Sequence, residues 1–384
     1  MELELSPAQE QFRQAAQAFA DEHVRPVAAR IDEENHFPLE LVRLAGAHGL
    51  LAMTVPQEWG GSERDFVSYA IAIEEIAKAS ATLAVILVVT NSLVADLVYH
   101  FGTPPQKQRW LSALAKGEIV GAFALSEAHA GSDAANQRTS ATVTSGGFCI
   151  DGSKVWVANA EAADVAIVIA ATSLRHGERG MTAFLVPLDS AGVSASATLD
   201  SLGVRGLGCR HLDFRRVVVS EAAVLGEREE GFKAALWALD AARVAIAAQA
   251  LGVGDAALRA ALEHARHRQA FGRPIGRYQA VQWMLADMAT ELDAARMLML
   301  KAAALHDARP RISLEAAMAK LQASEAAHRA ADKALQVLAS AGYQRGSAVE
   351  RYFRDARAAE IYSGTSEVQR MVIAEQILGV RAVE

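Results

Sequence analysis

Two stretches of the chain combine side chains that could do chemistry. The first, Ala124–Asp133, brings together hydroxyls, small residues and turn formers just ahead of a segment with strand character. In such a loop, exposed backbone N–H groups can meet an anion or the polar edge of a ring. By itself the pattern is a weak signal, because turn formers of this kind also occur in ordinary surface loops.

The second stretch places Ser92, Asp96 and His100 at positions i, i+4 and i+8 of an otherwise apolar helix. Residues at this spacing share one helix face. An aspartate on an apolar face is desolvated, and desolvation raises the pKa of a carboxyl towards the range useful for a general base. The alternative is an aspartate that pairs with a neighbouring arginine or faces solvent.

The elements that must position these residues change character twice along the chain. Apolar residues three and four apart predict helices from residue 6 to about 115. Short alternating segments between glycine-rich turns predict strands from about 118 to 226, and a helical period returns after Gly231. We therefore expect an N-terminal all-helical domain (1–117), a middle β domain (118–226) and a C-terminal helical bundle (227–384). Because strands and helices do not alternate, the order excludes a doubly wound nucleotide-binding fold.

Composition narrows the class of protein. The chain has 384 residues, 52% of them hydrophobic, and a formal charge of -7 without a block of like charges. Nothing supplies the positive field that nucleic acid or an anionic membrane requires. Cys149 and Cys209 are too few for a disulfide framework and lack zinc-site spacing, so we expect reduced, structural cysteines and no metal. The apolar run 81–89 is too short to span a bilayer, and no secretory or transit pattern opens the chain, so a cytoplasmic protein is expected.

The stretch Ala124–Asp133 resembles the first signature of the acyl-CoA dehydrogenase family, and the family's other motifs follow in the right order across essentially the whole chain. The resemblance implies an α+β fold with a helical N-terminal domain, a middle β-barrel or sandwich and a C-terminal four-helix bundle. It also implies FAD as cofactor, with Phe123, Leu125 and Ser126 along the flavin and Ser132 on the CoA side. Trp156 corresponds to the indole that packs on the flavin, while Ala158 replaces a threonine whose hydroxyl bonds flavin N5.

The remaining motifs carry further residues over by the same resemblance. Arg268, Phe271 and Gln279 match residues that reach a neighbouring subunit's FAD, which implies a homotetramer. The place of a glutamine-rich helix with two glycines is taken by Gln336, with Ala339 and Ser340 in place of the glycines. Thr365 and Glu367 are expected near the flavin, and Asp240 and Arg243 are expected to face CoA.

The residue in the family's catalytic position is Ser363, where most members carry a glutamate. A carboxylate removes the α-proton of the thioester, and an unassisted serine hydroxyl is not an effective base, so its loss costs on the order of 10²–10⁴ in rate. The base's alternative position, before the arginine of the Leu-Asp-x-x-Arg pattern, is Ala242. The Ser363 N–H can still polarise the thioester carbonyl. Asp96, on the helix that by the resemblance lines the acyl pocket, becomes the candidate base. The resemblance also disfavours a dicarboxylic substrate, because Ala84 stands where the glutaryl-type members of the family carry an arginine for the distal carboxylate.

These observations favour an FAD-dependent dehydrogenase of an unusual acyl-CoA, cyclic or already unsaturated, with a displaced base. Electrons are then expected to pass to an electron-transferring flavoprotein. The alternatives are a non-dehydrogenase flavoenzyme of the same fold, such as a monooxygenase, reductase or eliminating enzyme, and a catalytically silent subunit of a mixed oligomer.

Overall fold

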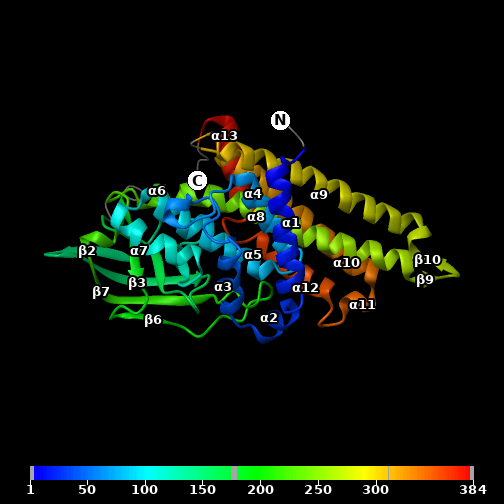
Figure 1. Cartoon of the computed structure of the whole chain (residues 1–384), viewed down its shortest axis with the longest axis horizontal. Helices are drawn as coiled ribbons and strands as arrows, with labels where there is room; N and C mark the ends of the chain where they lie inside the picture. The colour runs from blue at the N-terminus through cyan, green and yellow to red at the C-terminus, as the bar shows by residue number, and fades with distance from the viewer. Residues whose placement is uncertain (1–3, 174–179, 310, 381–384) are drawn as a thin grey trace.

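The computed structural model describes residues 4–173, 180–309 and 311–380, which form a helical part, a sheet and a second helical part in chain order (Figure 1). The expected fold class is confirmed. The first part contains the helices α1 (Pro7–Phe19), α2 (Ala28–Glu34), α3 (Leu39–Ala47), α4 (Phe66–Ala77), α5 (Ala81–Val88), α6 (Asp96–Phe101) and α7 (Pro104–Ala115).

Local signals explain where these helices begin. Ser6 caps α1 in a capping box with Gln9, and Pro7 occupies the first turn, where its missing N–H costs nothing. Between α5 and α6 the chain stays helical through a π-helical segment, Val89–Ala95, so that 81–101 is one continuous helical stretch.

The middle part is one sheet whose strands follow the order β6-β7-β3-β2-β4-β5-β8, with β1 paired to β4. Pairing is antiparallel except for β1 with β4 and β2 with β4. Phe148, Phe184 and Phe214 fill a core that belongs to the sheet itself. The strands are β1 (Gly121–Ala124), β2 (Ser140–Thr144), β3 (Gly147–Val157), β4 (Val165–Ala171), β5 (Met181–Pro187), β6 (Val193–Ala195), β7 (Arg210–Ser220) and β8 (Val224–Leu225).

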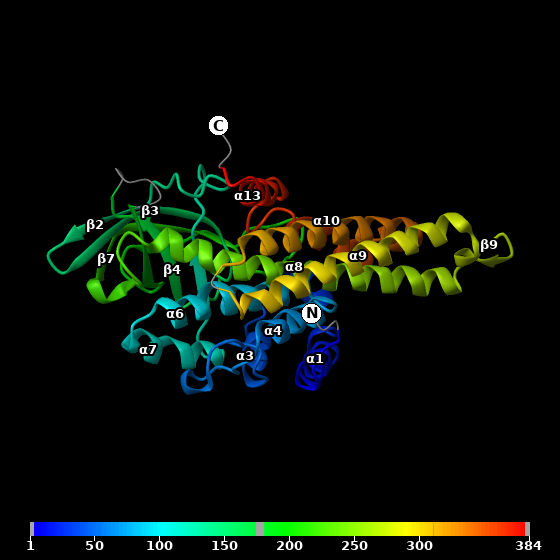
Figure 2. The same ribbon diagram turned by 90° about the horizontal axis from the view of Figure 1, so that it is seen from above.

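The second helical part is dominated by three long helices that run side by side, as Figure 2 shows. Small residues allow their close packing: a Cβ on Gly254 of α8 would lie 2.5 Å from Leu292 Cδ2 of α9 and 3.2 Å from Ala327 Cα of α10. The elements are α8 (Gly231–His267), the hairpin β9 (Gln269–Ala270) and β10 (Arg273–Pro274), α9 (Gln279–His306), α10 (Ser313–Leu338), α11 (Ser340–Tyr343), α12 (Ala348–Ala359) and α13 (Ser366–Leu378).

Two helical stretches, Ala81–Phe101 and Gly231–His267, are long and apolar enough to cross a membrane by length and composition alone. In the fold, 100% and 83% of their most apolar windows are buried. The apolar run 81–89, expected to be too short to span a bilayer, thus continues into a longer helical stretch, and its burial marks that stretch as a core helix of the molecule.

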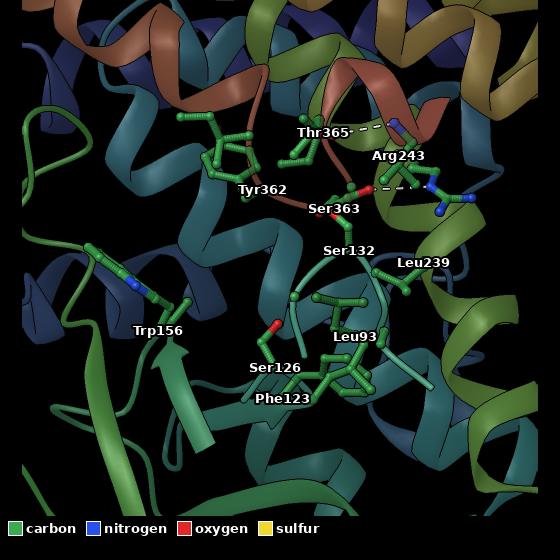
Figure 3. A pocket seen from close by; sticks show the side chains of 18 of the residues that line it. Leu93, Phe123, Ser126, Ser132, Trp156, Leu239, Arg243, Tyr362, Ser363 and Thr365 are labelled. Atoms are coloured by element: carbon green, nitrogen blue, oxygen red, sulfur yellow. Dashed lines mark hydrogen bonds between the residues drawn. The ribbon is translucent and has the colours of Figure 1, made fainter. Parts of the chain in front are cut away.

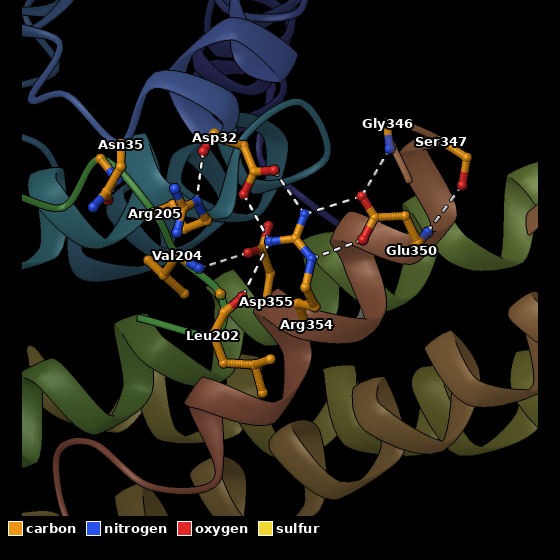
Figure 4. A network of polar contacts seen from close by, with 12 residues as sticks. Asp32, Asn35, Leu202, Val204, Arg205, Gly346, Ser347, Glu350, Arg354 and Asp355 are labelled. Carbon is orange, nitrogen blue, oxygen red and sulfur yellow. Dashed lines mark hydrogen bonds and ion pairs between the residues drawn. The ribbon is translucent and has the colours of Figure 1, made fainter. Parts of the chain in front are cut away.

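A polar network around α12 joins all three parts of the molecule (Figure 4). Arg354 forms two hydrogen bonds with the Asp32 carboxylate of α2, at 2.8 and 2.6 Å, and a third with Glu350 at 2.7 Å. The Val204 N–H donates to Asp355 at 2.6 Å. Because Asp32 of the N-terminal part and Val204 of the middle part both bind α12, the beginning of the turn at 360–365 is held in place.

Candidate active site

The cavity is large, about 2340 Å³, and lies between the sheet, the 81–101 helical stretch, α8 and the segment that leads into α13 (Figure 3). Many residues expected to contact cofactor or substrate do line it. They are Phe123, Leu125, Ser126, Ser132, Trp156, Ala158, Asp240, Arg243, Ser363 and Thr365.

Trp156 owes its position in the cavity to an irregularity in β3. The pairing of β3 with β7 shifts register between Lys154 and Val157, so that Trp156 adopts a φ of 54°. A bulge of this kind redirects a side chain away from the regular alternation. The indole stays 59% exposed although it belongs to a sheet, and it stands at the cavity wall with His211 beside it. A flat face that is both apolar and exposed is suited to stacking against a planar ring.

The loop after β1 is held from below by a fully buried lysine. Lys154 donates to the Leu125 carbonyl at 3.0 Å, to Glu127 at 2.8 Å and to Gln137 at 2.8 Å. Burial lowers the pKa of Lys154 to about 8, although the Glu127 carboxylate opposes that shift. The Ser126 carbonyl accepts from the Val155 N–H of β3 at 2.9 Å. Leu125 and Ser126 therefore present a fixed polar edge to the cavity.

Ser363 lies in a turn between α12 and α13 with a left-handed φ of 55°, and Gly364 follows with a φ of 94°. The Ser363 carbonyl accepts from Arg243 Nε at 3.3 Å and from Gln369 Nε2 at 3.2 Å. The Gly364 carbonyl accepts from Gln369 Nε2 at 2.9 Å and from Lys320 Nζ at 2.7 Å. Glycine suits position 364, because its φ is positive and because a Cβ there would lie 2.7 Å from Gln369 Nε2, so that this amide would have to shift.

The Ser363 and Gly364 carbonyls point into the protein, so the N–H groups of the same two peptide units, those of Gly364 and Thr365, point the opposite way. In a trans peptide, C=O and N–H point in opposite directions. The N–H groups of Ser363, Gly364 and Thr365 donate to no acceptor within the described parts of the chain. The turn thus combines satisfied carbonyls with three consecutive free donors at the cavity, which suits the oxygen of a thioester carbonyl.

Asp240 and Arg243 stand one turn apart on α8 and form an ion pair of 2.9 Å. Ser313, at the start of α10, donates to the second Asp240 oxygen at 2.5 Å. Burial raises the pKa of Asp240 and lowers that of Arg243, each against the attraction of the other. Both groups line the cavity, but the Asp240 carboxylate is already bound by Arg243 and Ser313 and is not free to act as a base.

The acyl-side wall contributed by the 81–101 stretch is apolar: Val85, Val88, Val89 and Leu93 line the cavity. The prediction that Asp96 belongs to this wall of the cavity is wrong. Asp96 is 2% exposed and is absent from the cavity lining, because its face of the helix packs against the core instead. Ser92 lies on that same inner side, where its hydroxyl pairs with Tyr69 at 2.9 Å.

Behind the wall, Asp96 sits in an incomplete polar setting. One oxygen accepts from the Thr54 hydroxyl at 2.5 Å, and the other is buried without a partner among the described residues. Burial raises the pKa of Asp96 to about 6, with the Thr54 hydrogen bond and His306 acting in the opposite direction. The elevated pKa expected of a base is present, but the carboxyl has no contact with the cavity.

Six of the expected site residues lie away from the cavity of this chain. Besides Asp96 they are Arg268, Phe271, Gln279, Gln336 and Glu367. Phe271 is 94% exposed at the hairpin β9–β10, which projects from the far end of the long helices (Figures 1 and 2). A side chain so exposed has no role within its own subunit's core.

Sequence reasoning missed the residues that hold the loop and the turn: Lys154, Lys320 and Gln369. A signal for Lys320 existed, because Ala316, Ala319, Ala323 and Ala327 mark its face of α10 as apolar. A lysine on such a stripe is buried and must find an acceptor. No comparable signal marks Gln369.

Comparison with known proteins covers nearly the whole chain. The family models for the N-terminal, middle and C-terminal domains of acyl-CoA dehydrogenases match residues 6–118, 122–217 and 229–378. The mitochondrial short-chain specific acyl-CoA dehydrogenase of Bos taurus is 42% identical over 376 residues, which are 98% of this chain and 91% of the relative.

Solved structures give the same picture. The butyryl-CoA dehydrogenase of Megasphaera elsdenii aligns with a TM-score of 0.96 at 36% identity, over 98% of this chain and 100% of that one. A chain from a structure described as the electron transferring flavoprotein of Acidaminococcus fermentans aligns with the same TM-score, identity and coverage.

Proposed function

Since this chain belongs to the acyl-CoA dehydrogenase family, and is an FAD-dependent oxidoreductase acting on CH–CH groups of acyl-CoA thioesters, we propose that its substrate is an unusual acyl-CoA. The acyl group is cyclic or already unsaturated rather than a simple saturated chain. The observation that carries this proposal is Ser363 at the cavity, together with an acyl-side wall that offers Val85, Val88, Val89 and Leu93 and no carboxylate among the described residues.

The residues around the cavity fit FAD. The exposed indole of Trp156 offers a stacking face, and Leu125 and Ser126 offer a fixed polar edge, while Ala158 supplies no hydroxyl. Bound FAD supplies the acceptor for a hydride.

Ordinary α,β-dehydrogenation removes the α-proton with a base while the β-hydrogen leaves with its electron pair, and a Cα–Cβ double bond forms. At residue 363 this chain can orient the carbonyl but cannot take the proton. In an acyl group that is already unsaturated, the departing proton lies farther along the chain. That proton passes to solvent that enters the cavity, while the hydride leaves with its electron pair and the new double bond forms, so a carboxylate at residue 363 is dispensable for such substrates.

One alternative keeps specific support. Ser363 and Ala158 together remove two polar groups from the reaction centre, and a flavoenzyme of this fold that performs monooxygenation, reduction or elimination has no need of them. Rapid reoxidation of the reduced flavin by air, without a carrier protein, would favour this alternative.

We further propose a cytoplasmic homotetramer that passes electrons to an electron-transferring flavoprotein. Phe271 at 94% exposure, Trp283 at 62% and Tyr343 at 80% leave large apolar surface uncovered on one chain, which supports association. Arg268, Phe271 and Gln279 then serve the neighbour's FAD. Sedimentation of a stable, FAD-loaded monomer would contradict the assembly.

Anaerobic mixing with a panel of acyl-CoAs tests the function. We expect flavin bleaching to be at least about a hundredfold faster with a cyclic or unsaturated acyl-CoA than with butyryl-CoA, since only the latter needs a base at residue 363. The cyclic probes must be ones whose departing proton lies beyond the α-carbon, because a saturated ring that loses an α-proton needs the same base as butyryl-CoA. Fast bleaching by butyryl-CoA would refute the proposal. Absence of bleaching by every acyl-CoA would favour the silent subunit.

A further inference from the structure

Lys320 is a buried cation next to the catalytic turn to which the family's reaction assigns no task here. Its side chain is fully buried in α10, and the hydrogen bond that it forms within the described residues runs 2.7 Å to the Gly364 carbonyl. A buried ammonium with a single neutral acceptor costs several kcal/mol in general, so its presence calls for an explanation. The alternative is a lysine that only fills space in the helix packing.

The charges around Lys320 are asymmetric. Arg243 of α8 adds positive charge on the cavity side, whereas Glu325 of α10, Glu360 beyond α12 and Glu367 of α13 supply the negative charge. Glu325 and Glu360 are already engaged, by Arg370 at 2.7 Å and by His328 at 2.9 Å. Because residue 363 is serine, the turn itself contributes no carboxylate to offset the ammonium.

Geometry connects this cation to the cavity. Lys320 and Gln369 fix the Gly364 carbonyl on the protein side, and the Thr365 N–H of the same peptide unit points the opposite way. We propose that Lys320 is a positioning residue: by holding the Gly364 carbonyl, its ammonium aims the Thr365 N–H at a thioester oxygen and favours the anionic, enolate form of a bound acyl thioester.

The inference rests on the proposed function in one respect, namely that the cavity binds an acyl thioester. Beyond that function, the inference predicts which acyl thioesters bind most tightly. Ligands that lose an α-proton easily, and so carry negative charge on the thioester oxygen, should bind more tightly than neutral analogues of the same length. The proton passes to solvent and its electron pair spreads over the carbonyls, so no protein base is needed for this equilibrium.

Acetoacetyl-CoA is a suitable probe, because its enolate absorbs differently from its keto form. The FAD-loaded protein is titrated with it at several pH values, and the apparent pKa of the bound ligand is read from the absorbance. We compare Lys320→Met, which removes charge and donor, with Lys320→Gln, which keeps a donor. Lys333→Met on the same helix is the matched control, since that amine pairs with Asp287 at 3.1 Å.

The expected result is a tenfold or larger loss of enolate affinity in Lys320→Met, seen as a rise of about one unit or more in the ligand's apparent pKa. Lys320→Gln should lose the same preference for the enolate but retain affinity for the keto form, and Lys333→Met should match the parent. Burial lowers the pKa of Lys320 to about 7, so the parent's preference should also fade above that pH while the variants show no such fading.

An apparent ligand pKa in both Lys320 variants equal to that of the parent would overturn the inference, even with FAD and ligand fully bound. If the parent protein does not bind acetoacetyl-CoA at all, the proposed function fails instead. Apolar replacement of a buried charge is commonly tolerated, and should Lys320→Met fail to fold, Lys320→Gln alone decides.

Discussion

The two walls of the cavity differ in the charged side chains that they contain. The wall built by α8, α10 and the turn at 363–365 buries Asp240, Arg243 and Lys320, and each has a hydrogen-bond partner. The opposite wall, from the 81–101 stretch, faces the cavity with valine and leucine and keeps Asp96 behind it, with one oxygen unpartnered among the described residues.

The comparison shows which half of the family's chemistry this chain retains. Groups that can orient a carbonyl are held by several donors, and residue 363 of the same turn is a serine, which brings no carboxylate. The carboxylate that the first wall does contain, Asp240, is held by Arg243 and Ser313, and the second wall brings no carboxylate to the cavity among the described residues. Orientation and proton transfer are therefore separable here, and substitutions on each wall can test this.

The largest effect is expected from restoring a carboxylate to the first wall. Ser363→Glu should raise flavin reduction by butyryl-CoA at least about a hundredfold, because the carbonyl-orienting turn is intact and only the base is lacking. Anaerobic stopped-flow absorbance of the flavin measures the rate. Ser363→Gln is the control, with equal size and no basicity.

No gain in Ser363→Glu, in protein that holds FAD and binds the ligand, would mean that the cavity holds the α-carbon away from residue 363. A gain of equal size in Ser363→Gln would show that side-chain length, and not basicity, was missing.

A smaller effect is expected on the second wall. Since Asp96 does not reach the cavity, Asp96→Asn should leave flavin reduction by the best substrate within about twofold, far from the loss of about a hundredfold or more that follows removal of a general base. A hundredfold loss, with FAD and substrate still bound, would reinstate Asp96 as the base and remove the contrast between the walls.

The same substitution should change stability with pH. Burial raises the pKa of Asp96 to about 6, so between roughly pH 4 and 6 the folded state binds more protons than the unfolded state. The parent therefore loses stability as pH rises through that window, and at pH 8 it carries a buried charge. The asparagine side chain of the variant carries no charge, so thermal unfolding should show the variant more stable at pH 8, by on the order of 3 kcal/mol, and by roughly half as much at pH 5, where the carboxyl of the unfolded parent is already ionised. A variant less stable than the parent at pH 8 would contradict this.

Sequence predicted the fold well because its periodicity changes at the borders of the sheet, and periodicity reports burial directly. It predicted the cavity residues of the loop and of α8 through motif resemblance. It placed Asp96 wrongly for a physical reason: helical spacing groups Ser92 with Asp96 on one face, but spacing does not tell whether that face meets a cavity or the core.

The role of Lys320 was not predicted, because its sequence surroundings suggest an exposed side chain. A single lysine in a long alanine-rich helix is typical of solvent exposure, and only the small residues around it indicate burial. Its acceptor, the Gly364 carbonyl, lies 44 residues later in the chain, so no local pattern could predict the contact.

The smallest effect concerns a departure from the family that lies on neither wall. Ala339, which stands where the family has a glycine, ends α10 with a φ of 51° and a ψ of -132°, a region that non-glycine residues rarely occupy. The strain costs about 1–3 kcal/mol, against which glycine loses about 0.5–1 kcal/mol through the greater freedom of its unfolded chain. Ala339→Gly should therefore raise the melting temperature by roughly 2 °C and leave flavin reduction unchanged. Ala15→Gly, at an exposed position inside α1, is the control and should lower it. If Ala339→Gly instead lowers the melting temperature as the control does, the backbone at 339 is not strained.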